Sequence, residues 1–200
     1  MLEMNVEELM SAVIDEVEEG FGCLTCINAV AALIDVSKVL GQALQPLTVR
    51  TIVLNPKLTE RVGDASDPGF DSQLRRWMEE EGSFRVALGI GEAPAGDWAG
   101  HLVAVGDLPE STKKIVIDPT LHQADRPTEK IVLSPMILRV DSARIQEGAH
   151  LWLRLNECGL LYSFFPRDYS FQQTPAWHDL GQRMFVRDRV LERLRKAGEL

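Results

Sequence analysis

The fold is decided by residues 101–120, which read HLVAVGDLPESTKKIVIDPT. Two apolar runs, 102–105 and 115–117, flank a polar segment rich in the residues that form turns. Strands so close in sequence pair antiparallel, so this stretch predicts a hairpin. The hairpin in turn predicts that His101, which opens the first strand, and Asp118, which follows the second, lie at the same end of neighbouring strands.

Short apolar runs bounded by Gly, Pro, Asn or Asp continue through most of the second half of the chain. Consecutive runs at this spacing predict an antiparallel sheet. We expect its strands at residues 47–54, 84–90, 101–106, 113–117, 131–133, 151–155 and 160–165.

Apolar residues at helical spacing occupy the two ends of the chain. A first helix is expected from Asn5, ended by Gly20 and Gly22. Residues 26–40 are apolar on nearly every side and predict a buried central helix that ends at Gly41. Two further helices are expected at residues 71–81 and 177–194.

The order of these elements predicts an α+β fold. N-terminal helices come first, the central cysteine-bearing helix packs on the antiparallel sheet, and a helix closes the chain. The 200 residues are 45% hydrophobic and can bury one good core. We therefore expect a single domain over residues 1–200.

Composition argues against several classes of function. The net charge of −9 repels nucleic acid and anionic lipid, so we expect neither nucleic acid nor a membrane as partner. Residues 1–9 are acidic and amphipathic rather than a basic leader, and no window is long enough to cross a bilayer, which favours a cytoplasmic protein. Three cysteines are too few for a disulfide framework and suit a reducing compartment.

A thiol at the start of a helix is the first candidate for chemistry. Cys26 opens the apolar helix, where unpaired N–H groups and the positive end of the helix dipole stabilise a thiolate. Gly20 and Gly22 would let the preceding backbone approach a substrate closely and offer N–H donors to a developing oxyanion. This arrangement is consistent with acyl chemistry.

A thiolate nucleophile needs a partner that takes and returns a proton, and histidine is the side chain best suited to it. His101 stands at the mouth of a strand, where it can face a cleft. The other histidines lie in or near loops: His122, His150 and His178. Asp118, at the same end of the hairpin, can orient the imidazole. The thiol, the imidazole and the carboxylate are therefore expected to form a catalytic triad.

Two segments carry a family resemblance. Residues 26–41, a cysteine that opens an Ala-rich helix ending in Leu-Gly, look like the nucleophile helix of transglutaminase-like and papain-like enzymes. His101-Leu-Val-Ala-Val, a hairpin and then Ile-Val-Ile-Asp118-Pro-Thr resemble the His and Asp-Pro-Thr segments of the transglutaminase-like superfamily. The resemblance covers residues 20–125. It implies a Cys-His-Asp triad acting through a thioester, in hydrolysis of peptide or isopeptide bonds, deamidation or acyl transfer to an amine.

Cys23 and Cys26 allow more than one interpretation. We favour Cys26 as the nucleophile, because the interval from Cys26 to Gly41 suits a nucleophile helix. Both thiols could instead be small apolar core residues. A thioredoxin-like redox site would need a strand before the pair, and a zinc site would need ligands from distant parts of the chain. We expect no metal and no other cofactor, and we interpret Cys158, in a turn at 156–159, as structural.

Two hypotheses of function follow. The first is a cysteine-dependent hydrolase or acyltransferase that acts on a peptide, protein or small amide. The alternative is a catalytically inactive protein of the same fold that binds a partner through another surface. The chain departs from the family in having no Trp directly after His101 and Gly20 where papain-like enzymes place an oxyanion glutamine. Trp98, His122 and Gln123 flank the expected site, and we interpret them as core or loop residues.

Overall fold

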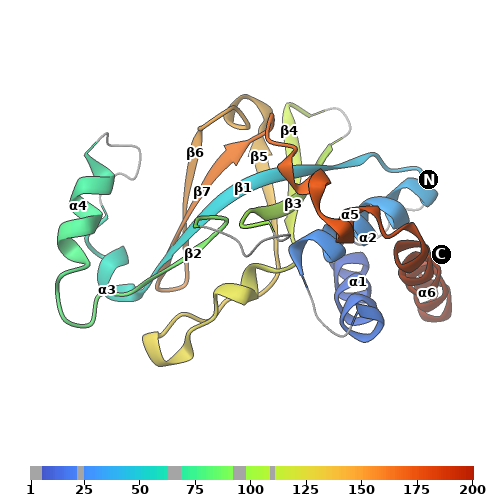
Figure 1. Ribbon diagram of the computed structural model, residues 1–200, viewed down its shortest axis with the longest axis horizontal. Helices are drawn as coiled ribbons and strands as arrows, with labels where there is room; N and C mark the ends of the chain where they lie inside the picture. Colours follow the sequence, from blue (N-terminus) through green and yellow to red (C-terminus); the bar gives the residue numbers. More distant parts are fainter. Residues whose placement is uncertain (1–5, 22–24, 63–68, 92–97, 109–110) are drawn as a thin grey trace.

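The structure, a computed structural model, describes residues 6–21, 25–62, 69–91, 98–108 and 111–200. These residues form a mixed α+β fold, as predicted (Figure 1). The elements in chain order are α1 (Val6–Phe21), α2 (Cys26–Val39), β1 (Leu44–Leu54), α3 (Pro56–Thr59), α4 (Phe70–Trp77), β2 (Arg85–Leu88), β3 (His101–Asp107), β4 (Lys113–Asp118), η1 (Leu121–Ala124), η2 (Pro127–Glu129), β5 (Met136–Asp141), η3 (Ser142–Arg144), β6 (His150–Leu155), β7 (Cys158–Phe165), η4 (Ser170–Gln173), α5 (Pro175–His178) and α6 (Leu180–Ala197).

The long strand β1 is the centre of an antiparallel sheet with the strand order β5-β4-β3-β1-β7-β6. One edge of β1 pairs with β7 over residues 48–54. The other edge has two partners: β3 pairs with residues 44–49 and β2 with residues 51–54. The partner changes at Arg50, so the start of β3 at His101 and the end of β2 lie at the same point along β1.

Helices α1, α2 and α6 gather at one side of the sheet and share an apolar cluster with it (Figure 1). α2 packs on β3 and β1, and α6 packs on α1 and α2. Their buried apolar side chains meet Leu102, Ala104 and Ile117 from the sheet. Leu33 and Val36 of α2 are completely buried, which confirms the predicted central helix.

The opposite face of the sheet contains a second apolar cluster. Alternate residues of β1 and β3, among them Val49 and Val103, join Tyr162 and Phe164 of β7 there. The segment between β4 and β5 adds buried apolar side chains to the same cluster. The hydroxyl of Tyr162 reaches Asp118 of β4 although β1 and β3 lie between the two strands, so the sheet is curled around this cluster.

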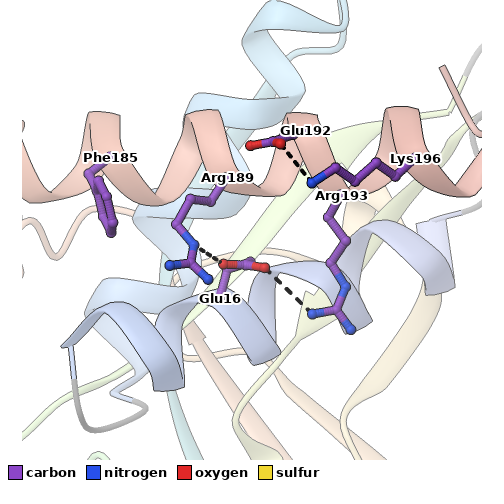
Figure 2. Close-up of a pocket in the computed structure, with 6 residues that line it drawn as sticks. All are labelled: Glu16, Phe185, Arg189, Glu192, Arg193 and Lys196. Atoms are coloured by element: carbon purple, nitrogen blue, oxygen red, sulfur yellow. Dashed lines mark hydrogen bonds and ion pairs between the residues drawn. The ribbon is translucent and has the colours of Figure 1, made fainter.

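Ion pairs fasten α6 to its neighbours. Arg183 makes two hydrogen bonds to Asp35 of α2, at 2.8 and 2.9 Å. Figure 2 shows Arg189 and Arg193 of α6 reaching Glu16 of α1. Because Glu16 is only 6% exposed, these arginines compensate a carboxylate that is nearly removed from water. Arg189 and Arg193, which line the pocket drawn in Figure 2, therefore stabilise the packing of α6 on α1.

The predicted strand at 131–133 is wrong. Ile131 makes only an isolated bridge with Arg126, and the apolar side chains of this segment are buried in the second cluster without entering the sheet. The edge strand β5 pairs with β4 instead, and the sequence pattern does not indicate it. Most side chains of β5 are half-buried or exposed, so its apolar alternation is weak.

β1 begins at Leu44 rather than at residue 47 and runs through Pro46. Residues 44–47 pair only with β3, because β7 pairs with β1 from Thr48 onward. A proline lacks the N–H that a central strand needs, and it is accommodated where one edge of the strand has no partner.

Two predicted helices have different ends. The helix predicted at 71–81 is α4, which ends at Trp77 and continues as turns. The helix predicted at 177–194 is two helices, because Asp179 starts α6 by accepting a hydrogen bond from the N–H of Gln182 at 3.1 Å.

The packing of α2 predicts a contrast between two valines of the same helix. Val36 is completely buried, whereas Val39 is 54% exposed. We expect Val36→Ala to lower the free energy of unfolding by about 2–3 kcal/mol, since it removes two buried methyl groups and leaves a cavity. Val39→Ala serves as the matched control and should change it by less than about 0.5 kcal/mol. Urea denaturation measures both, and equal losses would contradict the packing described.

Candidate functional site

His101 lies where β1 changes its edge partner from β3 to β2. It is the first residue of β3, pairs with Val49 of β1, and is 2% exposed. Gly89 follows β2 with a φ of +75° and lies against the backbone of Val49 and His101. A Cβ at Gly89 would come within 2.7 Å of the Val49 carbonyl oxygen and 2.8 Å of the His101 nitrogen. A glycine here therefore lets two strand ends meet around the histidine.

Asp118, the last residue of β4, is 1% exposed and uses both carboxylate oxygens. Its Oδ2 is 2.9 Å from Nε2 of His101, and its Oδ1 accepts a hydrogen bond from the N–H of Thr120 at 3.1 Å. The hydroxyl of Tyr162 also donates to Oδ2, at 2.7 Å. The carboxylate therefore fixes the ring of His101, whose Nε2 must carry a proton to donate to it.

Cys26 is the first residue of α2, and its thiol is free and partly exposed. Thr25 caps the helix by accepting a hydrogen bond from the N–H of Asn28 at 3.2 Å. The side chain of Cys26 acts on the imidazole of His101 through a hydrogen bond and through charge, and both raise the pKa of the ring. The structure thus brings together the three residues that the sequence predicted as a triad.

The charge state of His101 follows from these partners. Burial lowers the pKa of its imidazole, but the charge and hydrogen bond of Asp118 and the contact with Cys26 outweigh burial and raise the pKa from 6.5 to about 10. The ring is therefore an imidazolium at neutral pH. An imidazolium beside a sulfur atom stabilises negative charge on that atom, which is the condition that a thiol nucleophile requires.

Trp98 covers the backbone just before the histidine. Its ring lies so close to Gly100 that a Cβ there would be 1.8 Å from a ring carbon. Its Nε1 donates a hydrogen bond to Oγ of Ser170 at 2.8 Å, and its ring meets Phe171 edge-on at 6.0 Å. Trp98 is half-buried and packs against the same core cluster as Cys26, so it is a core residue, as the sequence analysis expects.

Two glycine and cysteine interpretations need correction. The first helix ends at Phe21, between the two glycines expected to end it, and Gly20 is packed rather than open: a Cβ would be 3.0 Å from Val186 of α6, and its carbonyl accepts a hydrogen bond from Gln182. Its small size therefore serves packing of α6 on α1. Cys158 lies at the start of β7 rather than in a turn, pairs with Leu155, and is buried in the second cluster, which agrees with a structural role.

The remaining candidates lie elsewhere or outside the described residues. Nδ1 of His150 is 2.8 Å from Oγ of Ser163, and His178 contacts a backbone carbonyl at the end of η4, so both histidines have other partners. His122 and Gln123 lie on η1. The predicted alternatives that involve Asn5, Gly22 and Cys23 fall on residues that the structure does not describe.

Tyr162 is the site residue that the sequence analysis missed. It is completely buried, and a buried tyrosine hydroxyl generally requires a hydrogen-bond partner. That signal was present in the strand predicted at 160–165, but it does not say which residue the hydroxyl meets. The partner becomes visible only when the curl of the sheet is known.

Comparison with protein-family models, with curated proteins and with solved structures finds no match. Within the described ranges, no group of three or more His, Cys, Asp and Glu side chains could hold a metal ion. No helix in the part of the chain that the structure describes combines the length and the apolar character needed to cross a membrane. Cys26, His101 and Asp118 are therefore the residues whose geometry bears on function.

The close approach at Gly89 predicts that an added methyl group disturbs the site. Gly89→Ala and Gly41→Ala both place alanine at a φ near +75°, which costs about 1–2 kcal/mol. A Cβ at Gly41 meets nothing within 4 Å, so Gly41→Ala is the matched control. We expect only Gly89→Ala to shift the NMR resonances of the His101 ring. We also expect it to lower the free energy of unfolding by a further amount of about 1–3 kcal/mol, because the added methyl group overlaps the backbone. Identical effects of the two variants would contradict the described contact.

The raised pKa of His101 predicts how stability depends on pH. Between pH 6.5 and the raised pKa, the folded protein holds a proton on His101 that the unfolded chain has lost, so the free energy of unfolding falls as pH rises. This contribution is complete below pH 6.5 and is lost as the pH passes about 10. The slope is at most about 1.4 kcal/mol per pH unit.

The measurement is best made in a Cys26→Ser background, which has no thiol at this position and in which Asp118 still raises the pKa of His101. Urea denaturation at about pH 7, 8 and 9 should then show a steady decrease in stability. Adding His101→Gln should flatten that decrease. A slope that is the same with and without the histidine would show that His101 has no raised pKa.

Proposed function

We propose that this protein is a cysteine-dependent hydrolase or acyltransferase that acts through Cys26, His101 and Asp118. The observation that carries the proposal is the buried imidazole of His101, which lies 2.9 Å from the carboxylate of Asp118 and whose pKa is raised by Asp118 and by Cys26. A nucleophile, a base and a group that orients the base are the three parts that acyl chemistry requires. Each comes from a different element: α2, β3 and β4.

In the proposed reaction, the sulfur of Cys26 attacks the carbonyl carbon of an amide and forms a C–S bond. The C–N bond then breaks, and the imidazolium of His101 gives its proton to the departing amine. The product is a thioester on Cys26. Water attacks this thioester in hydrolysis or deamidation, and a second amine attacks it in acyl transfer, while His101 accepts the proton of the attacking group.

The start of α2 supplies support for the developing negative charge on oxygen. The first N–H groups of a helix have no partner within the helix, and the Thr25 side chain takes only that of Asn28. This leaves the N–H of Cys26 as the donor nearest to a carbonyl attacked by its own sulfur. We propose it as one oxyanion donor in place of the glycines before the helix.

The arrangement also supports a papain and transglutaminase-like fold as the finer description of this α+β protein. In that arrangement a helix begins with the nucleophilic cysteine and packs on an antiparallel sheet whose neighbouring strands carry His and Asp. The corresponding elements here are α2, β3 and β4, and β3 and β4 pair antiparallel. Peptides, proteins and small amides are the substrate classes that this chemistry takes.

The first test is the rate at which iodoacetamide alkylates each cysteine, followed by peptide mass spectrometry. At about pH 6 we expect Cys26 to react about tenfold faster than Cys158, or more. The imidazolium of His101 stabilises the thiolate of Cys26, whereas Cys158 is buried in an apolar cluster. Cys158 is thus an internal control in the same molecule. The advantage of Cys26 should disappear in His101→Gln, provided that circular dichroism shows a folded variant.

A screen against fluorogenic peptide amides, with and without an added primary amine, tests catalysis itself. Cys26→Ala should abolish turnover while circular dichroism still shows a folded protein, whereas Cys158→Ala should retain turnover. Full activity in Cys26→Ala would refute the proposal. Slow alkylation of Cys26 that does not depend on His101 would favour the inactive binding protein instead.

A further inference from the structure

Asp118 has three hydrogen-bond donors, and two of them share one oxygen atom. Oδ2 accepts from Nε2 of His101 at 2.9 Å and from the hydroxyl of Tyr162 at 2.7 Å. Oδ1 accepts from the N–H of Thr120 at 3.1 Å. All three side chains, of His101, Asp118 and Tyr162, are at most 2% exposed, so water does not compete for these positions.

The hydroxyl of Tyr162 is not needed for packing. The neighbouring Phe164 lies on the same strand and in the same apolar cluster, and its ring stacks on that of Tyr162 at 6.3 Å with an angle of 6°. Phe164 fills its place without a polar atom, and a phenylalanine at position 162 would keep the same ring surface. A buried hydroxyl without a partner is unfavourable, so the hydroxyl of Tyr162 is accounted for by Asp118 alone.

We propose that Tyr162 is a positioning residue of the Cys26 site. Its hydroxyl orients the Asp118 carboxylate toward His101. Because the hydroxyl also donates to Oδ2, the carboxylate binds the imidazolium proton less strongly. The inference rests on the proposed function, in which His101 must release that proton to a departing amine. A carboxylate oxygen that accepts a hydrogen bond only from the imidazolium would stabilise the imidazolium more and raise its pKa further. Tyr162 thereby balances orientation against proton release.

Tyr162 can act in this way throughout the pH range of the folded protein. Burial, then the charge of Asp118 and the hydrogen bond to it, raise the pKa of the Tyr162 hydroxyl well above 10, so the hydroxyl keeps its proton and remains a donor. The ionisable groups that act on His101 are Asp118 from β4 and Cys26 from α2, and Asp118 is the group that acts on Tyr162. Tyr162 therefore reaches the imidazole through the carboxylate.

The experiment is an NMR titration of the His101 ring in Tyr162→Phe, without any substrate. Removing the hydroxyl should raise the pKa of His101 by about 0.5–1 unit, which is about a three- to tenfold increase in the ratio of imidazolium to imidazole at a given pH. The ring resonances should also broaden, because Asp118 has lost one of the contacts that fix it. With an active amide from the screen, kcat should fall and KM should stay unchanged.

Phe164→Leu is the matched control, since it disturbs the same stack of rings and leaves all three hydrogen bonds of Asp118 in place. It should lower the melting temperature without moving the titration of His101. A Tyr162→Phe variant that loses stability while His101 titrates as in the wild type would overturn the proposal and leave Tyr162 a structural residue. Because the titration needs no turnover, this result is distinct from failure of the proposed function, which Cys26→Ala decides.

Discussion

The pair formed by His101 and Asp118 is the constraint on which the rest of the structure depends. Two ionisable groups lie almost completely out of water, and such a pair is tolerated only when the remaining hydrogen-bonding positions are also filled. The Thr120 N–H, the Tyr162 hydroxyl and the Cys26 thiol fill them. Four separate parts of the chain must therefore meet at one carboxylate and one imidazole.

The architecture meets this requirement by dividing the edge of β1 between two partners. β3 begins at His101 and β2 ends at Leu88, so the two strands meet end to end along the same edge of β1. Gly89 lies at this point, where even a methyl group would meet Val49 and His101. Apolar clusters pack on both faces of the sheet around this point.

Much of this could be predicted from the sequence, and the exceptions have physical causes. His101 and Asp118 terminate the strands of one short hairpin, so their proximity follows from local pairing alone. Cys26 opens a helix whose apolar surface on nearly every side marks it as buried. These are short-range signals, and the structure agrees with them. The role of Gly20 was misjudged because the approach of α6, which determines it, comes from the far end of the chain.

Tyr162 was missed for a related reason. Its strand is separated from β4 by β1 and β3, and in a flat sheet its hydroxyl would be too far away to reach Asp118. Only the curl of the sheet brings them together, and curl is a property of many strands at once. The segment 131–133 illustrates the converse: its apolar residues look like a strand because they are buried, yet the cluster that buries them lies outside the sheet.

The position of β7 has a consequence for how the protein is made. β7 lies between β1 and β6 in the sheet, yet among the described strands it is the last to be synthesised, and its partner β1 is the first. A nascent chain that ends between residues 118 and 162 has the thiol, the imidazole and the carboxylate but neither the completed sheet nor the third donor to Asp118. During that interval the reactive groups are present without the fold that buries them, so the arrangement around Asp118 is completed only after β7 has been made.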